Sequence, residues 1–352
     1  MINNRSLELD FGRTGSHAET PNFDFLGPLR PTIVFSTYWQ FAVERQSVYM
    51  RRIRGEVPPW SNDPVLREHK FTNVYRAADR VSQYLIRHVI GADDREVADT
   101  FFRILLFKVF NRIETWELLV DSFGEPSVEG FDVEKYDKVL SAAFSAGDRL
   151  YSAAYIMPSG GKSNFPRKHT MHLHLIKKML EARVPNQIAE AKTMKSAFEL
   201  LRGFPTIGDF LGYQFVTDLN YSRLTDFCED DFVVPGPGAK GGLQKCFFTL
   251  GNLSEADAIR LVTEKQEDCL RELGLHFPTL WGRRLQLIDI QNIFCEVNKY
   301  ARVVHPEFHE KAGRSRIKQK LRPQSSVPVP LFPEKWGINH RLQQSPEYVP
   351  SR

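Results

Sequence analysis

The distribution of apolar side chains predicts a chain of amphipathic helices. From residue 32 onward, apolar positions recur three or four residues apart, the spacing that places side chains on one face of an α-helix. One such stripe runs through Val74, Ala78, Val81 and Leu85. Sustained alternation with a period of two, which is typical of strands, is scarce. The sequence therefore predicts an all-α fold.

One long helix is expected to be central, and one segment is expected to interrupt the helices. Residues 96–118 are apolar on most sides and predict a buried helix. Further helices are expected over 134–154, 170–183, 186–202, 206–216, 254–273 and 284–300. The sequence VPGPGAKGG (234–242) breaks this pattern, and a helix is expected to restart at Leu243. Because proline and glycine disfavour helix interiors, a hairpin between two helices is predicted over 233–243.

Composition divides the chain into three parts. Residues 1–30 are polar and rich in Gly, Ser, Thr and Asn, which predicts a poorly ordered lead-in. Residues 31–308 carry the helical pattern and predict one helical domain. Residues 309–352 begin with a run of lysines and arginines and continue as Pro-rich sequence. This last part is typical of a basic arm that engages phosphates, or of a solubilising tail.

The overall composition narrows the class of protein. The formal net charge of +4 permits a polyanionic partner without requiring one, because the placement of charge matters more than its sum. The cysteines lie far apart, which favours reduced intracellular thiols over a zinc knuckle or an iron–sulfur cluster. Neither an apolar leader nor a run of about 18 apolar residues occurs, so a cytoplasmic protein without membrane attachment is predicted.

The stretch 213–245 concentrates the candidate chemistry. Gln214, Asp218 and Tyr221 follow one another at i, i+4 and i+7, so their side chains are expected on one face of a helix. In the hairpin downstream, glycines allow a close approach of the backbone, and exposed N–H groups favour an anion. Phosphate contacts are therefore expected from Gly236, Gly238, Lys240, Gly241 and Lys245. A plain turn between two helices is the alternative interpretation.

Two other signals are set aside. The sequence GGKS (160–163) is similar to the end of a phosphate-binding loop, but Ile156 stands where that motif requires glycine, and no strand is expected before it. His169, His172 and His174 have no acidic or cysteine partner at a spacing suited to a metal. Neither a metal ion nor another cofactor is expected.

Six separated segments carry a family resemblance across about residues 32–305: TYWQFAVERQ, FTNVYRAADRVSQYL, LLFKVFNRIETW, GYQFVTDLNYS, VPGPGAKGGLQKCF and DIQNIFCEVNKY. Together they resemble the α-glutamyl/putrescinyl-thymine pyrophosphorylase family, whose related helical domains are named after 5-hydroxymethyluridine DNA kinases. The family is placed within the helix-hairpin-helix DNA glycosylase superfamily. The resemblance implies a monomeric helical bundle in two lobes with a cleft, acting on modified pyrimidines in double-stranded DNA.

The resemblance implies one of two chemistries. One is excision of a modified base, such as glucosylated hydroxymethylcytosine, as anti-phage defence. The other is a transferase reaction that displaces phosphate or pyrophosphate from an activated hydroxymethyl base and attaches an amino acid or polyamine. The chain offers no clear carboxylate cluster for a metal-bound pyrophosphate, so we expect a DNA N-glycosylase that leaves an abasic site. A DNA-binding protein without turnover is a third interpretation.

Excision assigns roles to particular residues. Cleavage of the N-glycosidic bond builds positive charge on the sugar, which a nearby carboxylate can stabilise while it orients water. Asp218 is expected in this role, with Asn220 positioning the water. The base must be rotated out of the duplex into a pocket. Side chains expected to line that pocket are Asn73, Arg76, Asn111, Gln214 and Tyr221. Lys245 is expected to contact phosphate, or to act as the amine of a lyase.

Overall fold

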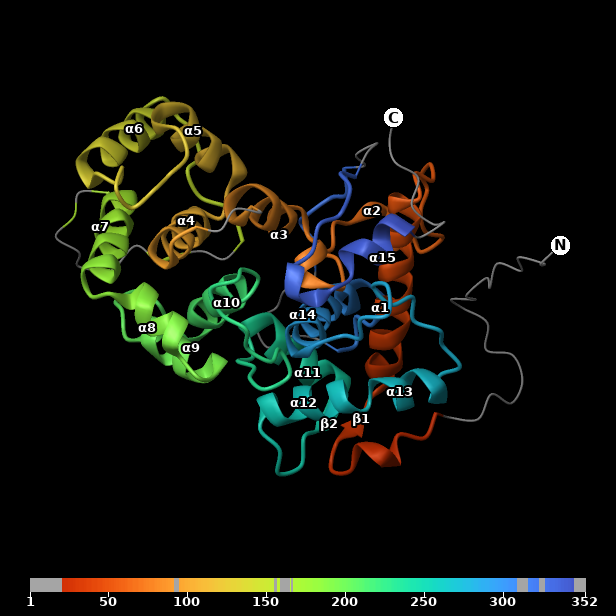
Figure 1. Ribbon diagram of the computed structural model, residues 1–352. Helices are drawn as coiled ribbons and strands as arrows, with labels where there is room; N and C mark the ends of the chain where they lie inside the picture. Colours follow the sequence, from red (N-terminus) through yellow and green to blue (C-terminus); the bar gives the residue numbers. More distant parts are fainter. Residues whose placement is uncertain are drawn as a thin grey trace.

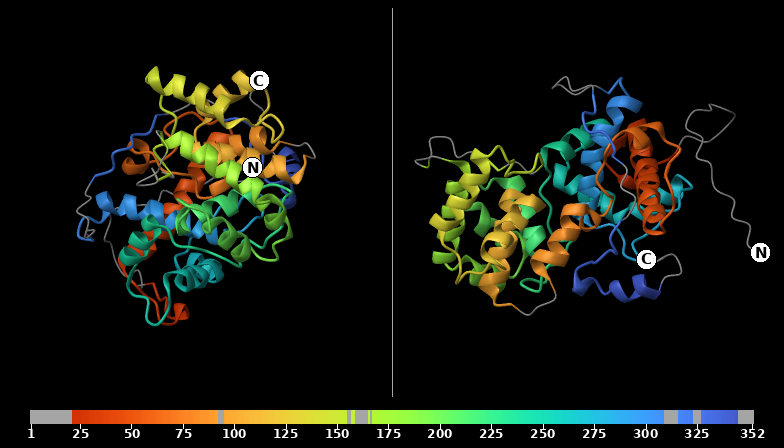
Figure 2. Two further views of the ribbon diagram at one scale, coloured as in Figure 1. Left: turned by 90° about the vertical axis from the view of Figure 1, so that its left-hand side faces the viewer. Right: turned by 90° about the horizontal axis from the view of Figure 1, so that it is seen from above.

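The computed structural model describes residues 21–91, 95–154, 157–158, 165, 167–308, 316–322 and 327–344. Over these residues the fold is helical with one two-stranded sheet, so the predicted all-α class is confirmed. Two groups of helices are visible, α4–α9 on one side and α1 with α11–α15 on the other (Figures 1 and 2). None of the helices in the described part of the chain is long and apolar enough to cross a membrane.

The first group is built around α14 (Leu287–Val304), which packs against α1 (Ile33–Ile53) and α11 (Pro237–Cys246). Tyr38 of α1 shows this packing: its ring centroid lies 4.5 Å from that of Phe294, and its hydroxyl donates to Ile290 O at 3.1 Å. The remaining elements of this group are η1 (Asp24–Leu26), β1 (Arg30–Pro31), α2 (Pro64–Glu68), η2 (Arg76–Ala78), β2 (Phe247–Thr249), α12 (Glu255–Glu264), α13 (Gln266–Glu272), η4 (Glu334–Trp336) and α15 (Asn339–Gln344).

The second group is built around α4 (Val97–Phe110), which is buried at every position from Phe101 to Phe110. It contacts α7 (Lys168–Glu181), α8 (Val184–Glu190) and α10 (Asp209–Leu219). The other elements are α3 (Arg80–Tyr84), the π-helical turn η3 (Leu85–Ile90), α5 (Ile113–Phe123), α6 (Val133–Ser145) and α9 (Met194–Arg202). Because α10 touches α4 and leads into the loop before α11, it joins the two groups.

The single helix predicted over 96–118 is in fact two helices. Asn111 ends α4 in the left-handed conformation, with φ of 49°, and its N–H donates to Phe107 O at 2.7 Å. Asparagine adopts this conformation more readily than most residues, so the chain turns here and α5 begins at Ile113. The turn places the Asn111 side chain beside the last turn of α4.

The structure also contradicts the predicted Pro/Gly hairpin. The helix α11 begins at Pro237 rather than at Leu243, with proline in the first turn, where its missing N–H has no intrahelical partner to lose. The glycines of α11 face α14: a Cβ at Gly238 would overlap Cys295 Sγ, and one at Gly242 would overlap the carbonyl oxygen of Phe294. These glycines allow two helix backbones to approach each other closely, which explains their presence without a phosphate.

Both ends of the described chain pack onto the helical groups. Leu26 and Leu29, in the predicted lead-in, are buried, whereas residues 1–20 lie outside the described residues. In the predicted basic tail, residues 316–322 run along α2, where Leu321 N donates to Glu68 O at 2.9 Å. Residues 327–344 cross the region between the two groups. The rest of the predicted tail is outside the described residues.

Candidate functional site

A buried polar cluster lies where the two groups of helices meet. Arg76 of η2 donates through Nη1 and Nη2 to the two carboxylate oxygens of Asp218, at 2.7 and 2.9 Å, and through Nε to Gln214 Oε1 at 3.0 Å. Its Nη1 also lies 3.2 Å from the Tyr221 hydroxyl. Lys108 Nζ lies 3.1 Å from Asp218 Oδ2 and 2.6 Å from Asn111 Oδ1. The Arg76 cluster is defined as Arg76, Lys108, Asn111, Gln214, Asp218 and Tyr221.

Elements distant in sequence position this cluster. Gln214 and Asp218 lie on α10, and with Tyr221 just beyond it they all contact Arg76, so the predicted common face is confirmed. Lys108 comes from the last turn of α4. Arg76 is fixed from behind, because its backbone N–H donates to Asp289 Oδ1 of α14 at 2.9 Å. The cluster therefore links η2, α4, α10 and α14.

Every member of the Arg76 cluster is at most 3% exposed, and Asp218 is 0% exposed. Charges at this depth need partners, because desolvation penalises an isolated charge heavily. Burial alone would raise the pKa of Asp218, but Arg76 and Lys108 hold the pKa of this carboxyl below its usual value. Burial lowers the pKa of Lys108 to about 8, although Asp218 opposes the shift. At neutral pH Asp218 is thus ionised, and Lys108 is the amine of the cluster that titrates closest to neutrality.

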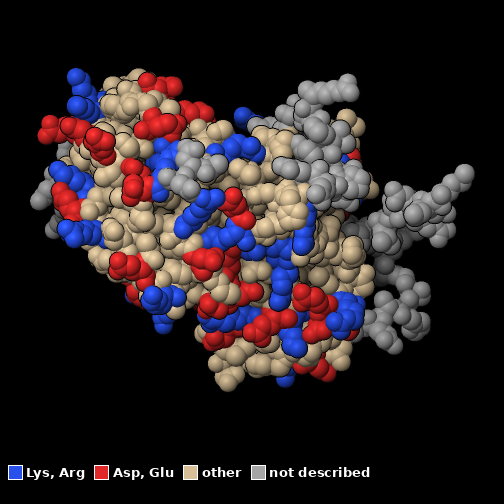
Figure 3. Space-filling view, viewed as in Figure 1, with Lys and Arg blue, Asp and Glu red and all other residues tan. Residues whose placement is uncertain are grey.

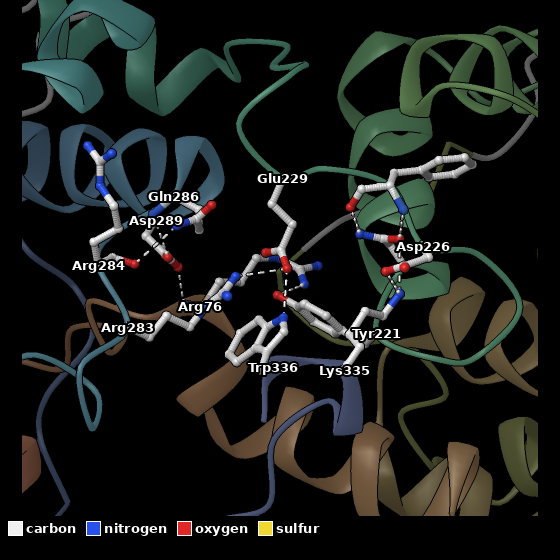
Figure 4. A network of polar contacts seen from close by, with 12 residues as sticks. Arg76, Tyr221, Asp226, Glu229, Arg283, Arg284, Gln286, Asp289, Lys335 and Trp336 are labelled. Carbon is white, nitrogen blue, oxygen red and sulfur yellow. Dashed lines mark hydrogen bonds and ion pairs between the residues drawn. The ribbon is translucent and has the colours of Figure 1, made fainter. Parts of the chain in front are cut away.

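A second polar network adjoins the cluster through Tyr221 (Figure 4). Trp336 of η4 donates its indole N–H to Glu229 Oε1 at 2.7 Å, and Arg283 Nη2 lies 2.9 Å from the same oxygen. The Arg283 guanidinium carbon lies 3.7 Å from the centroid of the Trp336 ring. Tyr221 meets that ring edge-on, with centroids 5.9 Å apart and an interplanar angle of 89°. The Trp336 slot is defined by Tyr221, Glu229 and Arg283.

Two of the predicted site residues belong to other networks. The Asn73 side chain accepts from Arg45 Nη2 at 2.5 Å and donates to Ala78 O at 2.7 Å. Asn220 closes the loop after α10: its Oδ1 accepts from Phe227 N at 2.9 Å, and its Nδ2 donates to Phe227 O at 3.0 Å. These contacts give Asn220 a structural role and do not bring it to the Asp218 carboxylate.

The predicted DNA-contacting residues differ in exposure. Gly238 and Gly241 lie within α11, and Gly236 is its N-cap. Lys245 is 4% exposed and donates to Asn298 O at 3.0 Å, a position that suits neither a phosphate contact nor a lyase amine. Lys240 is exposed and pairs with Glu255 at 2.9 Å. A phosphate contact through Lys240 stays a prediction.

Sequence reasoning missed Lys108, Glu229, Arg283 and Trp336. Lys108 carries one usable signal, since a lysine within the apolar run LLFKVF is a buried charge that needs a partner. A hollow of about 880 Å³ beside α8 and α9 includes Gln187, Lys192 and Leu200 but no predicted site residue. Within the described ranges, no three His, Cys, Asp or Glu side chains are grouped so that they could hold a metal ion.

The fold and the site define an all-α protein with a charged centre between two groups of helices. The chain belongs to the family described as "5-hmdU DNA kinase, helical domain", whose model matches residues 32–310. It is 28% identical over 288 residues to a protein named 5-hmdU DNA kinase from Bacillus phage SP10. That match covers 76% of this chain and 45% of the relative, so the chain spans less than half of the relative's length. No solved structure matches the chain.

These comparisons overturn the expected activity. The family and the relative are named for a kinase, which is a transferase, whereas excision of a base requires a hydrolase. The prediction of a DNA N-glycosylase is therefore wrong, and the anti-phage role expected from excision loses its basis. The predicted alternative, modification of the base within DNA, agrees better with the comparisons. The chain is a member of a DNA-modification enzyme family.

Proposed function

We propose that this chain is a DNA-modifying transferase and that it holds a 5-hydroxymethylpyrimidine of DNA while a group is transferred at the 5-substituent. Membership of the 5-hmdU DNA kinase helical-domain family over residues 32–310 is the observation that carries this proposal. The phage relative is named for 5-hmdU, and we take this modified base as the substrate of the chain. Because the match covers 45% of that relative, its kinase activity comes to this chain only as part of the proposal.

The Arg76 cluster offers what such a reaction needs. Phosphoryl groups are stabilised by preorganised cations, and an arginine can bind two oxygens of one group in parallel. Arg76 already binds the two oxygens of Asp218 in this way, at 2.7 and 2.9 Å. A phosphoryl group presents a similar pair of oxygens, so it competes with the Asp218 carboxylate for the same guanidinium. Asp218 then keeps Arg76 and Lys108 in place when no substrate is bound.

A proton acceptor is the second requirement. Asp218 is a weak base while two cations contact it, because they lower the pKa of its carboxyl. Burial lowers the pKa of Lys108 to about 8, so its neutral form is accessible near physiological pH. We assign proton acceptance to Lys108, which was not among the residues predicted from the sequence.

Two transfers use this pair of residues. In phosphorylation, the hydroxymethyl oxygen forms a bond to the phosphorus of a nucleoside triphosphate, the bond to the diphosphate leaving group breaks, and the hydroxyl proton passes to Lys108. In amine attachment, a carbon–nitrogen bond forms, the carbon–oxygen bond to the phosphate breaks, and Lys108 takes a proton from the amine. The kinase name of the family favours the first.

The charge of the surface only partly suits the binding of a polyanion such as DNA. On the face shown in Figure 3, Lys and Arg side chains gather in the middle, with Asp and Glu side chains among them. Mixed charge of this kind attracts DNA less strongly than a wholly basic face, because the negative side chains offset the positive ones. The proposal therefore relies on recognition of the modified base more than on the charge of the backbone.

Mass spectrometry of DNA tests the proposal. One duplex carrying a single 5-hydroxymethyluracil is incubated with the protein, ATP and Mg²⁺. A second duplex carrying the phosphorylated base is incubated with the protein and putrescine. We expect a mass gain on the DNA in the first reaction, and none on a duplex carrying thymine. A gain confined to the second reaction would select amine attachment. Release of a free base, or DNA of unchanged mass in both reactions, would contradict a transferase.

Variants assign the activity to the cluster. Lys108→Met keeps the length of the side chain and removes the amine, so it should reduce the rate of mass gain about 100-fold or more, the usual effect of losing a proton-transfer group. The matched control is Lys195→Met on the exposed side of α9, which should leave the rate unchanged. Equal rates for the two variants would remove Lys108 from the mechanism.

A further inference from the structure

The segment 331–342 closes the region above the Arg76 cluster. It is held at α3 by Gln83, whose side chain makes hydrogen bonds of 2.9 Å to both the N–H and the carbonyl of Leu331. It is held at the loop after α10 by an ion pair between Arg223 and Glu334. Between these anchors, Trp336 enters the Trp336 slot (Figure 4). The segment therefore covers Tyr221, which is 3% exposed in its presence.

The surroundings of Trp336 are those of a nucleobase site. A guanidinium lies over the face of the ring at 3.7 Å, and an aromatic side chain packs perpendicular to the ring. A carboxylate accepts the ring N–H at 2.7 Å. Proteins that bind unstacked bases use aromatic rings and arginine planes against the base, and polar groups on its pairing edge. Pyrimidines present imide or amino N–H groups on that edge, as the indole presents its N–H to Glu229.

Trp336 does not use all the hydrogen-bonding capacity of the slot. Glu229 Oε2 and Arg283 Nε are buried and have no hydrogen-bond partner among the described residues. The Glu229 side chain is only 8% exposed, so solvent access does not account for the unpartnered oxygen. Buried polar groups are almost always paired, and an unpaired one calls for an explanation. Since an indole carries a single N–H donor, a more polar ring would satisfy the slot better.

We propose that the Trp336 slot is a nucleobase-binding site, occupied by the protein's own Trp336 until an extruded pyrimidine of DNA replaces it. The proposal rests on the proposed function, which supplies DNA as the partner. Tyr221 belongs both to the slot and to the Arg76 cluster, and its hydroxyl lies 3.2 Å from Arg76 Nη1. A base in the slot therefore lies next to the cations that bind its 5-substituent.

The ion pairs beside Trp336 suit a displaceable occupant, whereas the buried side chains of Phe332, Ile338 and Leu342 hold the rest of the segment. The side chains of Arg223 and Glu334 are 62% and 71% exposed, and ion pairs this exposed hold little free energy. Lys335 pairs at 3.6 Å with Asp226, whose side chain is 90% exposed. The apparent affinity for DNA is the intrinsic affinity multiplied by the fraction of molecules in which the slot is open. Removing the occupant should therefore strengthen DNA binding.

The test compares full-length variants by fluorescence anisotropy with a labelled duplex that carries one 5-hydroxymethyluracil. Trp336→Ala should bind at least about fivefold more tightly than the wild type, because the competing ring is absent. Adding Arg283→Met to Trp336→Ala should abolish that gain. Glu334→Ala keeps the tryptophan and loosens an anchor, so it should tighten binding roughly twofold. Because Glu334→Ala keeps Trp336, it still tests the slot if Trp336→Ala does not fold.

The outcomes separate this inference from the proposed function. Equal or weaker DNA binding by folded Trp336→Ala, while the wild type binds the duplex, overturns the slot and leaves the transferase in place. If no variant binds the duplex but Trp336→Ala gains affinity for free 5-hydroxymethyl-2′-deoxyuridine, the slot stands and the proposed DNA substrate is wrong. If neither the wild type nor Trp336→Ala binds the duplex or the nucleoside, both are overturned. If Trp336→Ala does not fold, unchanged binding by Glu334→Ala overturns the slot.

Discussion

The contact between α11 and α14 and the Arg76 cluster are both buried, but different forces hold them. In the first, glycines bring two backbones together so closely that no added atom fits at Gly242. In the second, Asp218 lies between two cations, and its ion pairs with both of them permit burial. The contact between α11 and α14 allows only one arrangement of the two backbones. The Arg76 cluster, in contrast, can exchange the Asp218 carboxylate for another anion. This difference is the reason why we propose the cluster, rather than the glycine-rich helix, as the site that binds a substrate.

The largest effect is expected from removing the anion of the cluster. Asp218→Ala leaves Arg76 and Lys108 buried without a counter-charge, which should lower the free energy of unfolding by about 3–5 kcal/mol. Denaturant unfolding measures this change. The matched control is Asp209→Ala, which removes an exposed ion pair with Arg202 and should change stability little. Similar losses in the two variants would show that the cluster is not held by the ion pairs of Asp218.

The pH dependence of stability tests α14, the helix that packs against α11 and also holds Arg76 through Asp289. Burial raises the pKa of Asp289 to about 7 and that of Asp79 to about 6, from about 4 in an unfolded chain. The folded state therefore favours the protonated carboxyls, and their contribution to stability is complete below about pH 4 and is lost as the pH rises through 6 and 7.

Asp289→Asn isolates this contribution. The free energy of unfolding of the wild type should fall between pH 5 and pH 8 by roughly 2–4 kcal/mol more than that of Asp289→Asn, given 1.36 kcal/mol for each unit of pKa shift. Urea unfolding at the two pH values measures the difference. The same fall in both proteins would mean that the Asp289 carboxyl, which anchors Arg76, is not protonated by burial.

A smaller effect is expected in the glycine contact. Gly242→Ala places a methyl group against the backbone of Phe294, which side-chain rotation cannot relieve, and should cost about 1–3 kcal/mol. Gly203→Ala is the control, because a Cβ there meets no atom closer than 3.4 Å and the backbone φ is −64°. Unfolding temperatures compare the two. A neutral Gly242→Ala would mean that α11 and α14 can move apart to accept the methyl group.

The smallest change in stability is expected at Lys240, which is exposed on α11. Lys240→Ala should leave the unfolding temperature almost unchanged. If this lysine contacts a phosphate, DNA affinity should fall for all sequences alike, and the slope of log affinity against log salt should become shallower by about 1. Anisotropy titrations at several salt concentrations measure the slope. An unchanged slope would remove α11 from the DNA interface.

The sequence predicted what depends on local geometry. The spacing of Gln214, Asp218 and Tyr221 is enough to place them on one face, because helical geometry alone decides it. The break at Asn111 was missed because apolar periodicity continues across it. Lys108 was missed because its partner Asp218 lies on another helix, far along the chain. The glycines of α11 were assigned to DNA because the same residue type serves close contact with a phosphate and with a second helix.

The activity could not be derived from residue types. A buried carboxylate beside amides and an arginine suits stabilisation of a sugar cation as well as organisation of cations for phosphoryl transfer. The distinction depends on what occupies the site, and the family membership rather than the residue pattern favoured transfer. The Trp336 slot was equally inaccessible, since Glu229, Arg283 and Trp336 lie on three segments that are each more than 50 residues apart in the sequence.

The rate of mass gain on 5-hydroxymethyluracil DNA, measured from pH 6 to pH 9, tests the central claim most directly. Because burial lowers the pKa of Lys108 to about 8 and the neutral amine is needed, the rate should rise about tenfold for each pH unit below 8 and level off above it. A rate independent of pH over this range, or the same rate in Lys108→Met, would contradict the account.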